Sequence, residues 1–132
     1  MKEETIPVTK ETVIGETAKI KIEGYRFVTM TCVELDENQV DVIYHFDENL
    51  QLKHFRLTVS KDTLIPSISV VYQSAFLVEN EIQDLFGIHF DNLFIDYRRT
   101  LYLGGETIAA PFCKFTVKRT DKSAPAAVQA ET

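Results

Sequence analysis

The segment that decides the fold is residues 39–59, which read QVDVIYHFDENLQLKHFRLTV. Apolar and polar side chains alternate along both of its halves, which is typical of strands that bury one face. The apolar positions are Val40, Val42, Tyr44 and Phe46 in the first half and Phe55, Leu57 and Val59 in the second. The turn-forming residues Asp47-Glu48-Asn49 separate the halves. The segment therefore predicts two antiparallel strands, over residues 39–47 and 51–59.

The residues before this segment extend the predicted sheet. Residues 25–35 are rich in β-branched and aromatic side chains and apolar on both faces, which indicates a central strand. Asp36-Glu37-Asn38 supplies a turn into the next strand, so the three strands form an antiparallel meander. Further upstream, residues 9–23 predict a helix with Thr9 as N-cap and Gly24 just past its end. Residues 1–8 are expected to be an irregular terminus.

A second helix is predicted after the meander. Pro66 marks its entry, Ser67 can cap its free N–H groups, and Gly87 ends it after Phe86. Ala75, Val78, Ile82, Leu85 and Phe86 form one apolar stripe, and we expect Ile82, Leu85 and Phe86 to be core residues. The expected fold class is α+β, a two-layer domain with helices packed on an antiparallel-dominated sheet.

The expected domain spans residues 1–117, with a short strand at 100–103. Residues 118–132 read KRTDKSAPAAVQAET and have little to bury, so they are expected to be disordered or held by a partner.

Composition narrows the function classes. The net charge is −6 and the basic residues do not cluster, which argues against a nucleic-acid partner. No apolar run approaches the roughly 20 residues that span a bilayer, and the N-terminus has no apolar signal core. The chain is therefore expected in the cytoplasm, without direct membrane insertion.

The inventory of possible metal ligands is small. Cys32 and Cys113 form no CxxC motif, and His45, His54 and His89 do not fall at metal-ligand spacing with them. An iron–sulfur cluster needs about four thiolates, more than the two available. We therefore expect no metal or cofactor in this chain and two reduced cysteines that serve packing.

The second predicted helix has an unusual distribution of side chains. Phe76 and Leu77 lie outside its apolar stripe, among the polar side chains. Such a mixed polar and aromatic face can be a solvated helix face, a protein–protein interface or, less readily, an acid–base or metal site. The interface hypothesis names ten contact residues, four of them just beyond the helix: Phe76, Leu77, Glu79, Asn80, Glu81, Asp84, Asp96, Tyr97, Arg98 and Arg99.

Residues 66–90, PSISVVYQSAFLVENEIQDLFGIHF, resemble the signature region of the 30-kDa/C subunit of respiratory complex I. They look closest to the D subunit of Ech-type energy-converting NiFe hydrogenases. The shared positions are Pro66, Ser67, Ile68, Ala75, Glu79, Glu81, Asp84, Phe86, Gly87 and Phe90. Complex I subunits usually carry arginine at the position of Asn80, and residues 93–99, LFIDYRR, replace their His-Pro-Asp-Leu-Arg-Arg.

The resemblance implies a cofactor-free subunit, peripheral on the cytoplasmic side of the cell membrane. It would contact a NiFe large subunit and an iron–sulfur small subunit directly, and the membrane subunits indirectly. The whole complex would pass electrons from ferredoxin to protons. One alternative is the C subunit of a complex I-like quinone oxidoreductase. Another is a free-standing small enzyme that uses Asp84 and His89.

Overall fold

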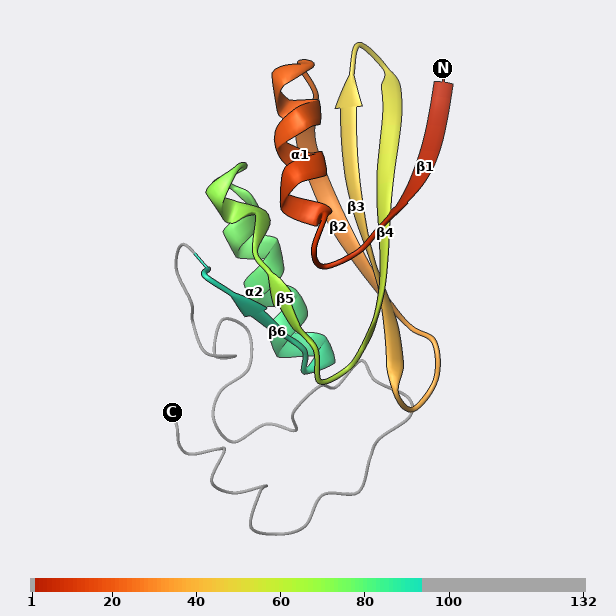
Figure 1. Cartoon of the computed structure of the whole chain (residues 1–132), viewed down its shortest axis with the longest axis vertical. Helices are drawn as coiled ribbons and strands as arrows, with labels where there is room; N and C mark the ends of the chain where they lie inside the picture. The colour runs from red at the N-terminus through yellow and green to blue at the C-terminus, as the bar shows by residue number, and fades with distance from the viewer. Residues whose placement is uncertain (1, 94–132) are drawn as a thin grey trace, which may run out of the picture.

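The computed structural model describes residues 2–93, which form a four-stranded sheet with two helices on one of its faces (Figure 1). The sheet has the order β1-β4-β3-β2, and a separate pair of short strands, β5 and β6, lies beyond the second helix. The elements are β1 (Lys2–Val8), α1 (Val13–Ile22), β2 (Arg26–Glu34), β3 (Gln39–Glu48), β4 (Gln51–Ser60), β5 (Leu64–Pro66), the 3-10 turn η1 (Ile68–Val70), α2 (Ala75–Phe86) and β6 (His89–Asp91). The expected α+β fold class is confirmed.

The meander β2-β3-β4 is antiparallel, as the alternating pattern predicts. Tyr44 of β3 lies opposite Phe55 of β4, and both side chains are completely buried beneath the helices. The centroid of the Phe46 ring lies 5.2 Å from that of Phe55 and 5.6 Å from that of Tyr72, and both pairs are tilted, as aromatic pairs favour. The inward positions of β3 and β4 therefore form the centre of the hydrophobic core.

Two predictions about the sheet are wrong. Residues 2–8 are not irregular: they form β1, which runs parallel to β4 with Ile6 opposite Phe55. Pro7 is tolerated there because β1 is an edge strand, where a missing N–H interrupts no second ladder. The strand β2 was expected in the centre, but it lies at the other edge of the sheet formed by residues 2–93.

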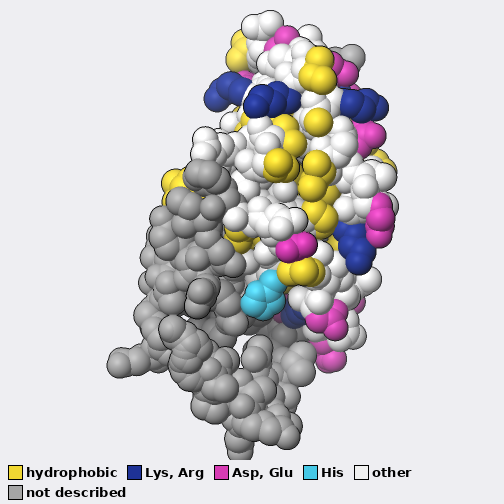
Figure 2. Space-filling model, turned by 60° about the vertical axis from the view of Figure 1, so that its left-hand side comes forward, with side chains coloured by type: hydrophobic (Ala, Val, Ile, Leu, Met, Phe, Trp, Pro, Cys, Tyr) yellow, Lys and Arg dark blue, Asp and Glu magenta, His cyan; other side chains and the backbone are white. Residues whose placement is uncertain are grey.

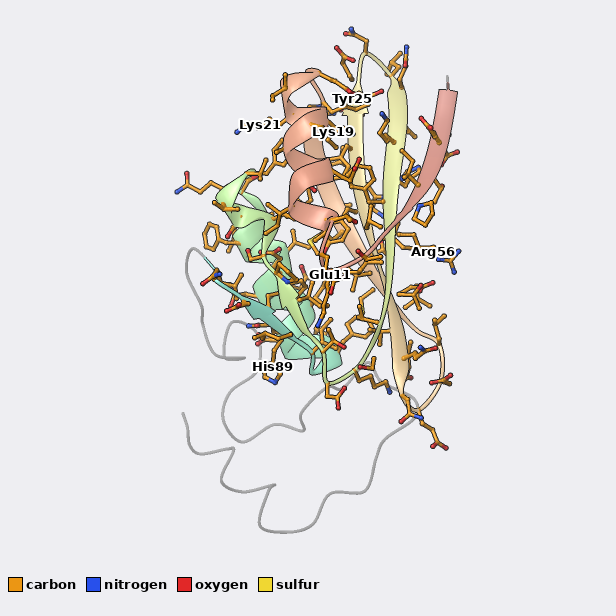
Figure 3. The ribbon with its side chains drawn as sticks, viewed as in Figure 1. Glu11, Lys19, Lys21, Tyr25, Arg56 and His89 are labelled. Atoms are coloured by element: carbon orange, nitrogen blue, oxygen red, sulfur yellow. The ribbon has the colours of Figure 1, made fainter. Side chains whose placement is uncertain are left out.

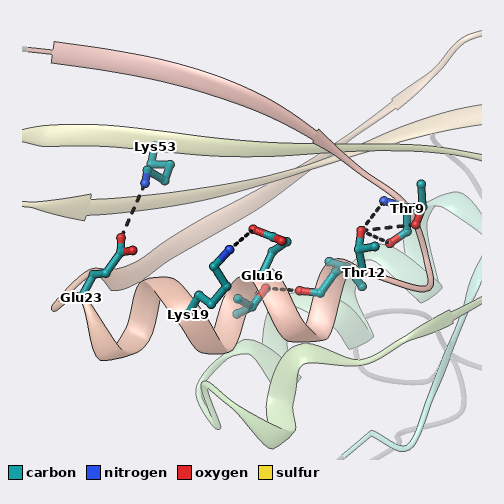
Figure 4. Close-up of polar contacts among 8 residues, drawn as sticks. Thr9, Thr12, Glu16, Lys19, Glu23 and Lys53 are labelled. Carbon is teal, nitrogen blue, oxygen red and sulfur yellow. Dashed lines mark hydrogen bonds and ion pairs between the residues drawn. The ribbon is translucent and has the colours of Figure 1, made fainter.

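The first helix begins later than its predicted N-cap. Thr9 instead opens a turn in which its N–H donates to Thr12 Oγ1 at 3.0 Å and its carbonyl accepts from the Val13 N–H at 2.9 Å (Figure 4). At the other end the prediction is confirmed, because Gly24 follows the helix with φ +102°. A side chain at Gly24 would also meet Glu48 Oε2, 2.8 Å from the position of a Cβ.

The predicted second helix is two separate elements. Ser67 is extended and its Oγ accepts from the Ser69 N–H, so it caps η1, while α2 starts only at Ala75. The predicted end is confirmed: Gly87 takes the left-handed conformation at φ 76° and its N–H donates to the Gln83 carbonyl at 3.0 Å. The predicted strand at 100–103, the domain end at 117 and the tail 118–132 lie outside the described residues.

Candidate interaction site on helix α2

Helix α2 packs against two different partners within the chain. On one side Ala75 and Ile82 are buried in the core beneath the sheet. On another side the helix faces η1 and β6, which continue the chain before and after it (Figure 1). A helix between two layers has no single wet face, so polar side chains on its second side have to be satisfied inside the protein.

Glu79 provides the principal polar link to η1. Its side chain is completely buried, Oε1 accepts from the Ser67 hydroxyl at 2.6 Å and Oε2 accepts from the Ile68 N–H at 2.9 Å. Burial raises the Glu79 pKa to about 7, and the hydrogen bonds from Ser67 and Ile68 act in the opposite direction. The carboxyl group therefore satisfies the first backbone donor of η1 and fixes that turn to α2.

Gln83 and Asn80 make the equivalent link to β6. Gln83 Oε1 accepts from the Phe90 N–H at 2.9 Å, and its Nε2 lies 3.4 Å from Asn80 Oδ1. Asn80 Nδ2 in turn donates to the Phe76 carbonyl one turn earlier, at 2.8 Å. These side chains position the segment after the helix and do not point outward.

Tyr44 lies in the core close to this polar side of α2. Its pKa is raised well above the ordinary value, first by burial, then by Glu79 and then by Cys32. The phenol is therefore neutral at physiological pH, and the Cys32 side chain is buried as well.

The expectation that the polar residues of α2 line its outer side has to be corrected. Glu79, Asn80 and Asp84 are all completely buried, because η1 and β6 add a second packing layer that a helical-wheel projection does not contain. Of the six predicted contact residues within residues 2–93, three keep part of their surface exposed: Leu77, Glu81 and Phe76. Leu77 is 47% exposed and Glu81, one turn later on the same side, is half-buried.

The remaining predicted contact and core residues differ in how far they are buried. Phe76 is half-buried, and Asp96, Tyr97, Arg98 and Arg99 lie outside the described residues. Of the three expected core residues, Ile82 is confirmed and Phe86 is partly buried against the core. Leu85 is half-buried and, instead of entering the core, lines a groove between α2 and β2.

This groove lies beside the outward residues of α2. Its walls are Val78, Glu81, Leu85 and Phe86 from the helix and Thr29 and Thr31 from the strand, and it encloses about 260 Å³. Glu81 is the charged residue of its lining. The groove and Leu77 together form the α2 surface, defined as Leu77, Val78, Glu81, Leu85 and Phe86.

The residues named for a metal or acid–base site are placed as follows. Within residues 2–93 no group of three or more His, Cys, Asp and Glu side chains is arranged to hold a metal ion. His89 is exposed on β6 (Figure 3), whereas Asp84 is completely buried. Neither helix in this part of the chain is long and apolar enough to cross a membrane.

Comparison with known proteins places this geometry in a family. Residues 6–119 match the family described as the 30-kDa subunit of the respiratory-chain NADH dehydrogenase. The chain belongs to this family. The resemblance to the complex I 30-kDa/C subunit is thereby confirmed, and the finer resemblance to Ech-type hydrogenases is not decided by this match.

Curated relatives are subunits C of NADH-quinone oxidoreductases. The protein from Ruegeria pomeroyi is 42% identical over 67 residues, covering 48% of this chain and 34% of the relative. The protein from Dinoroseobacter shibae is 34% identical over 105 residues, covering 74% of this chain and 48% of the relative. The matches therefore span about half or less of these relatives.

A solved structure shares the fold. It belongs to the membrane-bound sulfane sulfur reductase, an archaeal respiratory membrane complex, and superposes with a TM-score of 0.66 over 77% of this chain and 63% of the other. The sequence identity is 15%, so this likeness concerns the fold alone.

Proposed function

We propose that this chain is a cofactor-free structural subunit of a complex I-like respiratory oxidoreductase, and that it docks on the large catalytic subunit through the α2 surface. The observation that carries the proposal is the family match over residues 6–119 together with the exposed Leu77 on the signature helix. In the family-wide arrangement implied by the sequence resemblance, the subunit is peripheral and on the cytoplasmic side of the membrane.

The internal contacts of α2 support a structural role. Glu79 and Gln83 use their acceptors on backbone N–H groups of Ile68 and Phe90, so these polar groups hold the fold and are closed to a substrate. The outward residues are a leucine and a half-buried glutamate, a combination suited to an apolar contact bordered by one ion pair with a partner. Burying Leu77 completely would contribute up to about 1 kcal/mol at its present exposure.

The rest of the surface is also of the kind found in protein assemblies. Figure 2 shows hydrophobic side chains interspersed with basic and acidic side chains on one face of the molecule. Within residues 2–93, Ile22 and Val70 are the most exposed of the large hydrophobic residues, at 87% and 73%. These residues are further candidates for contacts with neighbouring subunits.

Two assemblies can contain such a subunit. The relatives named as subunits of NADH-quinone oxidoreductases favour a quinone-reducing complex. The second candidate is an Ech-type NiFe hydrogenase fed by ferredoxin, favoured by Asn80 in place of the usual arginine. In the first the large subunit carries no NiFe ligands. In the second it carries two CxxC pairs that hold NiFe, and a small subunit carries iron–sulfur clusters.

The test is purification of the tagged full chain from solubilised membranes, with mass spectrometry of the proteins that accompany it. A large subunit with the two CxxC pairs, together with hydrogen production from reduced ferredoxin, identifies the hydrogenase. A large subunit without them, together with quinone reduction, identifies the quinone enzyme. Recovery of the chain alone, with activity or bound metal of its own, would refute the structural role.

Leu77→Asp, with Leu50→Asp as matched control, tests the docking surface. Leu77 lies in the first turn of α2, where an aspartate is tolerated, and Leu50 lies in the β3–β4 turn at 70% exposure. We expect Leu77→Asp to lose the partner subunits and Leu50→Asp to keep them, while both variants show the same unfolding midpoint as the wild type. Retention of all partners by Leu77→Asp would overturn the proposed surface.

A further inference from the structure

The face of the sheet that points away from the helices carries a continuous line of hydrogen bonds. Thr31 Oγ1 lies 2.8 Å from His45 Nε2, His45 Nδ1 lies 2.8 Å from His54 Nδ1, and His54 Nε2 lies 2.7 Å from Glu3 Oε2. The four residues come from β2, β3, β4 and β1, which is their order across the sheet. The two imidazole rings are 4.9 Å apart and meet edge-on at 80°. All four strands are thus joined by side chains as well as by the backbone.

Counting hydrogens fixes the direction of this line when both rings are neutral. The Glu3 carboxylate can only accept, so His54 carries its hydrogen on Nε2 and its Nδ1 is an acceptor. The facing nitrogen of His45 must then donate, which makes His45 the Nδ1–H tautomer. Its Nε2 is left as an acceptor for the Thr31 hydroxyl. The donors therefore run from Thr31 through both rings to Glu3.

One added proton can be accommodated without breaking any of these contacts. The added hydrogen can be placed on His54 Nδ1, because His54 Nε2 already donates to the Glu3 carboxylate at 2.7 Å. His54 Nδ1–H then donates to His45 Nδ1, and His45 changes to the Nε2–H tautomer and donates to Thr31 Oγ1. The contact between the rings keeps its length and reverses its direction.

A second proton cannot be accommodated in this geometry. Both Nδ1 atoms would carry a hydrogen while facing each other at 2.8 Å, and two positive rings would lie in contact. Consistently, the His45 pKa is lowered, first by burial and then by His54, with Glu3 acting in the opposite direction. The two histidines therefore titrate as a coupled pair.

The neighbouring charges on this face are already paired. Next to His45 along β3, Asp47 is bonded to Arg26 with a 2.6 Å contact. Next to His54 along β4, Arg56 is bonded to Asp41 with a 2.7 Å contact. These pairs are neutral as units, so the charge that acts on the two rings comes mainly from Glu3.

We propose that Glu3, His54, His45 and Thr31 form a binding site for a single proton, and that this site holds β1 on the sheet in both of its charge states and excludes a second proton while the two rings stay in contact. Glu3 lies in β1 and both rings lie in the central strands, so a second proton would break the side-chain contact between β3 and β4, whereas His54 Nε2–H would still donate to Glu3 on β1. The site is independent of the α2 surface.

The experiment follows the ring nitrogens of the full-length ¹⁵N-labelled chain by NMR between pH 8 and pH 4.5. We expect His45 as the Nδ1–H tautomer at pH 8 and as the Nε2–H tautomer after uptake of one proton. Uptake of the second proton should need at least a tenfold higher proton concentration and should coincide with loss of the hydrogen bond between the two Nδ1 atoms. Two Nε2–H tautomers at pH 8 with independent titrations, or a hydrogen bond between the Nδ1 atoms that persists with both rings charged, would overturn the proposal.

Two variants separate the site from general effects of pH. Glu3→Gln keeps an acceptor beside His54 but removes the charge, so the site should take up its first proton only at a lower pH than in the wild type. His89→Gln removes the exposed histidine of β6, which lies outside the line, and should leave the ring signals of the pair unchanged. Equal midpoints in the wild type and Glu3→Gln would also overturn the proposal.

Discussion

Replacement of Glu79 by glutamine should change how the stability of the protein depends on pH. The Glu79 pKa is about 7 in the folded chain and 4.5 in the reference unfolded state. Because folding raises this pKa, the folded chain retains the proton between these values while the unfolded chain releases it. The contribution of the group is therefore fully present below pH 4.5 and is lost as the pH rises through 7.

The size of the effect follows from the two pKa values. The rise of the pKa from 4.5 to about 7 corresponds to roughly 3 kcal/mol over the full titration, most of which falls between pH 5 and pH 8. Glutamine fits the same position, because its carbonyl can accept from the Ile68 N–H and its amide can donate to Ser67 Oγ. The variant thus keeps the contacts and removes the titration.

The assay is urea unfolding of the wild type and Glu79→Gln at pH 5, 6, 7 and 8. The free energy of unfolding of the variant minus that of the wild type should rise by roughly 2 to 3 kcal/mol from pH 5 to pH 8. This corresponds to roughly 1 M in urea midpoint for a domain of this size. Other groups, His45 among them, cancel in the difference. Glu16→Gln on α1 is the control for loss of one carboxylate. A Glu79→Gln difference that follows this control at every pH would refute the buried, protonated Glu79.

Two further substitutions test particular contacts by urea unfolding. Gly87→Ala should cost about 1 kcal/mol or more, since Gly87 has φ 76° at the end of α2, and an unchanged midpoint would contradict the left-handed cap. Arg56→Ala should lower the free energy of unfolding by roughly 3 kcal/mol, because the Asp41 side chain is 2% exposed and would be left as a buried charge without its ion-pair partner. Asp41→Ala should lower it by only about 1 kcal/mol, because the Arg56 side chain (Figure 3) is 54% exposed and can be hydrated. The reverse order would show that the ion pair is solvent-exposed.

The sequence predicted the meander because each of its strands follows one simple rule. Val40, Val42, Tyr44 and Phe46 lie at every second position over a full strand length, and the structure buries all four completely. The helix end at Gly87 was predictable for a similar reason, since a glycine after an apolar stripe commonly ends a helix in the left-handed conformation. Local patterns of this kind depend only on residues that are close in sequence.

The features that sequence reasoning missed depend on distant partners. In β1 only Ile6 and Val8 point inward, and its pairing with β4 joins residues about 50 positions apart. Burial of Glu79 and Gln83 depends on η1 and β6 covering a second side of α2, which no periodicity within the helix records. Their i,i+4 spacing on one side of the helix was the available signal, and it was interpreted as a wet face.

The sequence did not predict that β2 is an edge strand, because apolar residues on both faces are found in central strands and also in edge strands that another segment or chain covers. Val28 and Val33 are each 43% exposed, so the second apolar face is only partly used within residues 2–93. In an assembly, such positions are candidates for contact with another chain.

Photo-crosslinking from position 77 can show directly whether a partner subunit contacts the α2 surface. A photoreactive phenylalanine derivative replaces Leu77 in the full chain within its native membranes, and the same substitution at Leu50 provides the comparison. We expect a crosslink from position 77 to the large catalytic subunit and a much weaker one from position 50. An assembled complex that gives no adduct from position 77 would contradict this expectation.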